Sequence, residues 1–135
     1  MQRQVSSMQL GKVTVRLWHV IAIAVAFVAH VVLFFSTHDR WSAGVGYFVL
    51  IPLITTATVF GLRGGLLLGI LAHPLNLVLW FLAGETIDQR FLQPNKIGAW
   101  GFALIIGVAI GYFKDINVRH RETVQNLAKT NVKLS

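Results

Sequence analysis

The sequence predicts an all-α protein that crosses a membrane four times and keeps both termini in the cytoplasm. Its 135 residues are 55% hydrophobic and only 13% charged, whereas a soluble domain carries about 25% charged residues. A chain this short cannot bury so much apolar surface in a soluble core. The charged residues also gather between long uncharged runs, which is typical of an integral membrane protein.

The central stretch, residues 47–83, contains two apolar runs joined by the short turn GLRGG, whose one charge is Arg63. A connection this short makes the two runs antiparallel neighbours, so we predict a helical hairpin in the bilayer. Further apolar runs on either side complete a bundle of four spans. The predicted spans are residues 13–35, 43–60, 65–83 and 97–113.

Polar segments flank this predicted bundle. Residues 1–12 are expected to form a cytoplasmic leader, and residues 114–135 a basic cytoplasmic helix. The second segment has a weak heptad pattern broken by amides, which is compatible with a coiled-coil seam. A solvated helix lying along the lipid headgroups explains the same pattern equally well.

The distribution of charge gives the predicted orientation. In a four-span bundle the termini and the Arg63 turn share one side, which carries nine Lys and Arg against two Asp and Glu, whereas the other side carries three of each. Because Lys-rich and Arg-rich segments stay in the cytoplasm, both termini are predicted to lie inside. We assign the basic excess to topology and to anionic lipid rather than to nucleic acid. Trp80 and Trp100 fall at the opposite ends of their spans, as interfacial aromatics do.

Small residues at four-residue spacing indicate where the helices touch, because close backbone approach holds membrane helices together. The third span has one such pair, and the fourth span has a longer ladder. The predicted packing positions are Gly65, Gly69, Ala103, Gly107 and Gly111. Whether they face this bundle or another chain is open at this point.

Histidines inside the spans are candidates for function, because a polar side chain in hydrocarbon needs a partner. We single out His30 and His73 as candidate cofactor ligands, for haem iron or for a chlorophyll-type pigment. Their different expected depths fit poorly with a single bis-histidine haem. A helix-to-helix hydrogen bond is the simpler interpretation of His30.

A polar pocket is predicted at mid-membrane between the second and third spans. Pro52 and Pro74 each leave a backbone carbonyl without its helical donor, and such a group must find a partner in lipid. The pocket would bind an apolar or weakly polar ligand, or act as a flexible kink, unless its groups satisfy only each other. The residues assigned to it are Pro52, Thr55, Thr56, His73, Pro74 and Asn76.

No enzyme motif accompanies these residues. Glu85 and Asp88 form a carboxylate pair without a basic or nucleophilic neighbour in sequence, and there is neither a phosphate loop nor a zinc-protease motif. The chain has no cysteine, which excludes disulfides and thiolate metal sites. We therefore expect neither catalysis nor a metal site.

Pro52 and the motif F-G-x-R-x-G, formed here by Phe60, Gly61, Arg63 and Gly65, resemble the membrane region of bacterial sensor histidine kinases. The resemblance covers about residues 43–135. It implies a signal-transducing module of the bacterial inner membrane that acts through helix contacts. The 135 residues include neither a phosphotransfer domain nor an ATP-binding domain, so the module itself is expected to be non-catalytic.

The alternative function is an accessory subunit of a larger photosynthetic or respiratory complex, in contact with lipid, pigment or partner helices. The expected partners are membrane lipid and either other membrane subunits or further copies of the chain.

Overall fold

The computed structural model describes residues 2–41, 44–86 and 94–135, with side chains from residue 16 onwards. All regular structure in these residues is helical, as the sequence predicts. The elements are α1 (Gln2–Thr37), the 3-10 helix η1 (Val45–Val49), α2 (Leu50–Leu82) and α3 (Pro94–Leu134).

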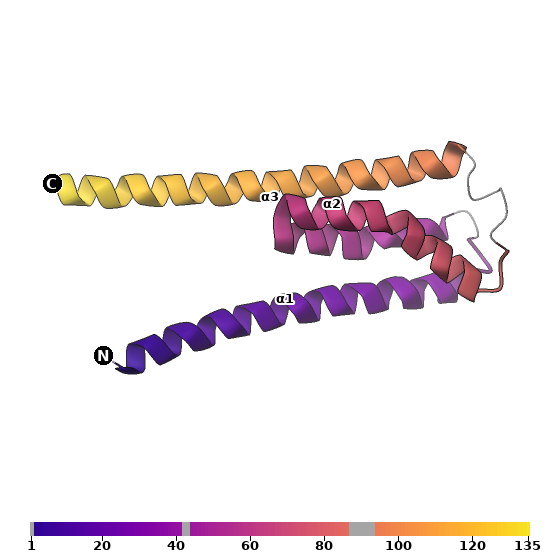
Figure 1. Ribbon diagram of the computed structural model, residues 1–135, viewed down its shortest axis with the longest axis horizontal. Coiled ribbons are helices and arrows are strands. Elements are labelled where there is room, and N and C mark those ends of the chain that lie inside the picture. The colour runs from indigo at the N-terminus through magenta and orange to yellow at the C-terminus, as the bar shows by residue number, and fades with distance from the viewer. Residues whose placement is uncertain (1, 42–43, 87–93) are drawn as a thin grey trace.

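Helix α2 reverses direction at Gly61, so it forms a hairpin of two helical halves (Figure 1). Gly61 has φ 69° and ψ −147°, a region that residues with a Cβ avoid. Contacts across the hairpin confirm the reversal: Asn76 Nδ2 donates to the carbonyl of Gly46 at 2.9 Å, and Ala57 packs against Gly65. The turn expected between the second and third spans, at residues 61–64, is thus reduced to one non-helical residue.

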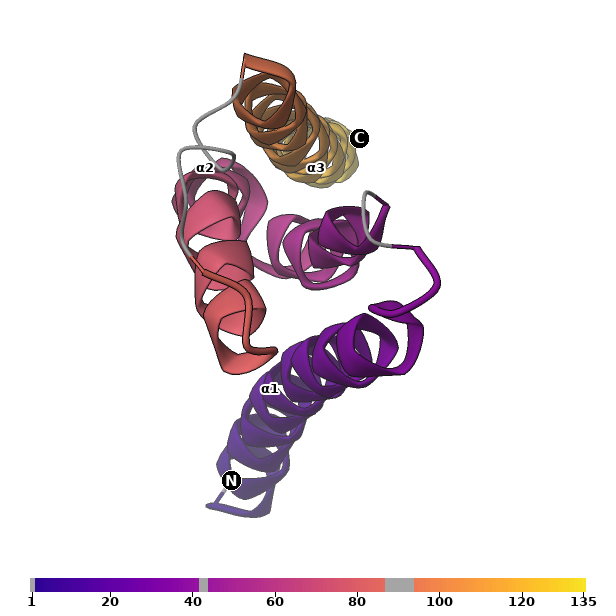
Figure 2. The ribbon, with the colours of Figure 1, turned by 90° about the vertical axis from the view of Figure 1, so that its right-hand side faces the viewer.

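The two halves of α2 lie between α1 and α3 (Figure 2). The Gly61 reversal faces the same side of the molecule as both ends of the chain, and α1 and α3 extend beyond it on that side, which we call the turn end (Figure 1). The opposite end, where residues 38–41 and 84–86 lie, is called the loop end.

In the described part of the chain, three helical stretches are long and apolar enough to cross a membrane: Arg16–Thr37, Val45–Leu82 and Pro94–Leu134. The second and third predicted spans both fall in the second stretch, because it includes the folded-back α2. The fourth predicted span and the basic segment after it form one uninterrupted helix, α3, of 41 residues. This helix begins at Pro94, since proline suits the first turn of a helix, where no N–H is needed.

Pro52 lies inside the second apolar stretch, as predicted, but not in the interior of an α-helix. It is the third residue of α2, directly after η1, and the first turn of a helix tolerates proline. Pro74 alone lies in the helix interior of α2.

The second half of α2 and α3 approach through their glycines. A Cβ on Gly65 would overlap the carbonyl oxygen of Gly107, and a Cβ on Gly111 would lie 2.7 Å from Leu62 Cα. A Cβ on Gly69 would lie 3.1 Å from Leu104 Cα. The backbones therefore touch along an antiparallel line, a geometry that maximises dispersion contacts between the two helices.

Lys114 and Asp115 of α3 together cap the α2 reversal, and we call this pair the turn clamp. Lys114 Nζ donates to the carbonyl of Val59, where the first half of α2 ends. Asp115 Oδ2 accepts the backbone N–H of Leu62 at 3.0 Å, where the second half begins. Each charge also matches the helix dipole end that it meets.

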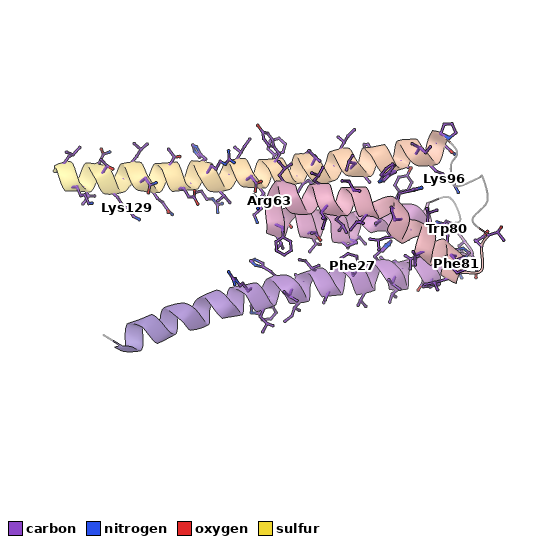
Figure 3. All side chains as sticks on the ribbon, in the orientation of Figure 1. Phe27, Arg63, Trp80, Phe81, Lys96 and Lys129 are labelled. Carbon is purple, nitrogen blue, oxygen red and sulfur yellow. The ribbon has the colours of Figure 1, made fainter. Side chains whose placement is uncertain are left out.

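Helix α1 packs on the other side of α2, chiefly near the loop end. Phe34 is fully buried against Val45 and Leu79, and its ring meets that of Trp80 edge to face at 5.4 Å. Two turns before Phe34 in α1, Phe27 packs against the buried cluster that contains Leu53 (Figure 3). This side of the bundle therefore depends on large apolar side chains rather than on glycine contacts.

Replacing Gly107 by valine is expected to lower the free energy of unfolding by about 1–3 kcal/mol, because the added side chain meets backbone. The matched control is Gly101→Val on the same helix, where a Cβ meets no atom of the described residues within 4 Å. Unfolding in mixed detergent micelles, followed by circular dichroism, measures the free energy of unfolding of both variants. Equal loss in the two variants would contradict the glycine interface.

Asp115→Ala is expected to cost about 1 kcal/mol, the usual loss when a helix N-cap acceptor is removed. Glu122→Ala is the control, because Glu122 is an exposed carboxylate two turns further along α3. The same unfolding measurement applies, and an unchanged Asp115→Ala variant would show that the turn clamp does not stabilise the reversal.

Candidate functional site

A cavity of about 380 Å³ lies near the loop end, between η1, the second half of α2 and the first turns of α3. This volume is within the range of small-molecule sites in proteins. Helix α2 contributes His73, Asn76 and Trp80, and α3 contributes Lys96 and Trp100. All the major elements except α1 therefore build this site.

Trp100 fixes the wall that α3 provides. Its indole Nε1 donates to the carbonyl of Gly69 at 3.0 Å. Trp100 lies one turn of α3 before Leu104, the residue that Gly69 approaches closely. The imidazole of His73 faces the indole, with ring centroids 5.6 Å apart and planes tilted by 31°. The bond and the ring contact together hold His73 and Trp100 in fixed positions at the cavity.

Asn76 fixes the opposite wall. Its amide nitrogen donates to the carbonyl of Gly46 in η1, which ties the second half of α2 to η1 beside the cavity. Its Oδ1 is buried and accepts no hydrogen bond within the described part of the chain. Tyr47, 52% exposed, stands at the rim on the same side.

Lys96 and Trp80 lie at the loop end of the cavity (Figure 3). The ammonium of Lys96 lies 5.7 Å from the centroid of the Trp80 ring, a cation–π contact. His38 also packs against Trp80, with ring centroids 4.9 Å apart and ring planes at 60°. Nδ1 of His38 lies 3.4 Å from Asp39, and its Nε2 lies 3.9 Å from Glu85.

The residues predicted to form a polar pocket are divided by the structure. His73 and Asn76 line the cavity, whereas Pro52, Thr55, Thr56 and Pro74 do not. Thr55 donates to the carbonyl of Ile51 at 2.8 Å, and Thr56 is buried away from the cavity. Pro74 lies on the exposed side of α2. The cavity therefore has α3 as a wall and is not confined to the two predicted spans.

The five predicted packing residues, in contrast, come together. Gly65, Gly69, Ala103, Gly107 and Gly111 all lie between the second half of α2 and α3. Ala103 also lines the cavity. The glycine interface therefore continues directly into the cavity wall.

His30 and His73 lie in different surroundings. His30 is 2% exposed in α1 and interacts with the backbone of Phe48, although neither ring nitrogen reaches normal hydrogen-bond geometry. His73 lines the cavity and His30 does not. A bis-histidine haem between the two does not fit this arrangement, and a pigment ligand role for either one alone stays a prediction.

The chemistry of the cavity suits binding. Aromatic rings, two amides, one imidazole and one ammonium line it, a combination that orients a small ligand by stacking and hydrogen bonds. Within the described ranges no three His, Asp or Glu side chains gather as a metal site. Asp88, of the predicted carboxylate pair, lies outside the described residues.

Sequence reasoning missed Lys96, Trp80 and Trp100 as site residues. The two tryptophans fitted the pattern of an interfacial belt, and Lys96 counted only as a loop charge. The available signal was the position of Trp100 three residues before Ala103, on the same face as the small-residue ladder.

Trp100→Phe is expected to lower the free energy of unfolding by about 1 kcal/mol, because the Gly69 carbonyl loses the indole donor. Trp18→Phe is the matched control, since Trp18 is 65% exposed on α1. Thermal unfolding in detergent compares the two variants, and equal midpoints would contradict a structural role for the Trp100 bond.

Comparison with protein-family models, with curated proteins and with solved structures gives no match to this chain.

Proposed function

We propose that this protein is a non-catalytic, signal-transducing module of the bacterial inner membrane, with the cavity as its input site and the basic end of α3 as its output. In this proposal α1, the two halves of α2 and the first part of α3 cross the bilayer. Both termini and the turn end lie in the cytoplasm. Helix contacts, rather than chemistry, carry the response.

One observation supports this proposal most directly: α3 is a single helix that joins the cavity to an exposed segment. Lys96 and Trp100 of its first turns line the cavity. Every residue from Ile116 onwards is exposed, and this part of α3 extends well beyond the bundle (Figure 1). A rotation or shift at the cavity would therefore reach the far end without a break in the helix.

Surface composition supports membrane insertion. Many large apolar side chains on the outside of the bundle are more than half exposed, including Val25, Val28, Phe102 and Ile105. Water would solvate this surface poorly, whereas lipid chains would cover it. Arg63 is exposed at the turn end and Lys129 lies on the extension beyond it (Figure 3), which agrees with basic residues on the cytoplasmic side.

The glycine interface supports a mechanical role. Two backbones in direct contact have few alternative packings, so a displacement of α3 at the cavity must move along the Gly65–Gly107 contact or break it. The turn clamp would then be the last fixed point before the exposed segment.

The experiment places residues 1–135 before the catalytic part of a reporter histidine kinase. Trp100→Ala and Gly107→Val are expected to change phosphorylation of the reporter severalfold, because one alters the cavity and the other alters the interface. Trp18→Ala and Gly101→Val are the matched controls and should leave phosphorylation unchanged. Equal output from all four variants, present in membranes at equal amounts, would overturn the signalling role.

A separate measurement tests the orientation. The chain has no cysteine, so His38→Cys and Arg63→Cys each provide a single label site. A maleimide that cannot cross membranes should reach position 38 from outside and position 63 only after lysis. Labelling of both from one side would overturn the topology.

The accessory-subunit alternative is favoured by the extension itself. Four of its apolar side chains are more than half exposed: Val124, Leu127, Val132 and Leu134. A partner protein would cover them. Copurification of this chain with coloured subunits, in mild detergent and at fixed stoichiometry, would favour the accessory role over the sensor role.

A further inference from the structure

A second hollow lies at the turn end, between the first half of α2 and α3, where α3 leaves the bundle. We call it the basic groove. Its volume is about 430 Å³, and it is more open than the cavity at the loop end. Its polar lining residues are Thr58, Lys114, Asn117 and Arg121.

Two cations stand along one wall of the basic groove. Lys114 and Arg121 are seven residues apart on α3, so they share a face about 10 Å apart along the helix axis. Lys114 gives one N–H to the Val59 carbonyl, and an ammonium has three. Among the described residues, none that lines the groove is acidic, and Asp115 is turned towards Leu62. The groove is therefore a positive site rather than a salt-bridged one.

The neutral polar groups of the groove can serve a hydroxylated headgroup. Thr58 donates its hydroxyl to the carbonyl of Thr55 at 2.8 Å, so its oxygen remains an acceptor towards the groove. Asn117 adds an amide one turn after Lys114. An anion that also carries hydroxyl groups would satisfy both.

The other side of the groove is apolar. Ile110, Phe113 and Val118 line it, and Phe113 is 66% exposed. A soluble anion would leave these side chains in water. A hydrocarbon chain passing along Ile110 and Phe113 would cover them, at the depth where the charged extension of α3 begins.

We propose that the basic groove binds an anionic phospholipid with a hydroxylated headgroup. Its phosphate lies between Lys114 and Arg121, its headgroup hydroxyl meets Thr58, and one acyl chain follows Ile110 and Phe113. This assignment rests on the membrane placement given under the proposed function, but not on the signalling role. Bound lipid would thus hold the outgoing end of α3 against the first half of α2.

The test uses the full chain in neutral detergent, titrated with phosphatidylglycerol and separately with phosphatidylcholine, and native mass spectrometry counts the bound lipid. We expect saturable binding of phosphatidylglycerol and weaker binding of phosphatidylcholine. Arg121→Gln should weaken phosphatidylglycerol binding about fivefold, the effect of one cation near an anionic membrane surface.

Arg119→Gln is the matched control. It removes the same charge two residues away, about 200° around the helix from Arg121, and Arg119 is not part of the groove lining. The affinity of the Arg119→Gln variant for phosphatidylglycerol should equal that of the unaltered chain. Equal weakening in both variants would show a diffuse charge effect and overturn the site.

Two further outcomes decide between ligands. Glycerol phosphate at the same concentration should not displace the lipid, and displacement would mean that the groove takes a soluble phosphate instead. Equal binding of the two lipids would also overturn the proposal. Recovery of the chain in the soluble fraction would overturn the membrane placement itself, whereas a silent kinase chimera would leave the lipid site standing.

Discussion

The direct backbone contact between α2 and α3 is the constraint on which the other features depend. Gly65 and Gly107 allow two helices to approach so closely that no side chain fits between them. This contact fixes the register of α3, which in turn brings Trp100 to the Gly69 carbonyl at one end and Asp115 to the Leu62 N–H at the other. The cavity and the turn clamp are therefore two consequences of a single interface.

Much of the architecture could be predicted because it depends on local sequence. Apolar runs predict helices of membrane length, and the Gly61 turn predicts their reversal. The spacing of Gly65, Gly69, Gly107 and Gly111 indicates a packing face without any knowledge of the partner. What spacing does not provide is which face meets which, because that depends on register between segments far apart in sequence.

The parts that could not be predicted follow from this register. Asp115 meets a backbone N–H 53 positions earlier in the chain, and Trp100 meets a carbonyl 31 positions earlier. In sequence Asp115 is only an acid among bases, and Trp100 only an aromatic at the end of a span. The position of Pro52 within its helix was not predicted for a different reason: the 3-10 start at Val45 shifts the beginning of α2 so that its first turn includes this proline.

The turn clamp also has a consequence for how the chain assembles. A chain synthesised from its N-terminus completes the α2 hairpin before Lys114 and Asp115 exist. Until α3 arrives, the reversal lacks the two caps that α3 provides, and water or, in the proposed membrane placement, lipid headgroups at the cytoplasmic surface must satisfy its backbone groups. In that placement we expect the nascent hairpin to remain near the membrane surface, in contact with water. It would pack fully only when α3 comes to lie beside it.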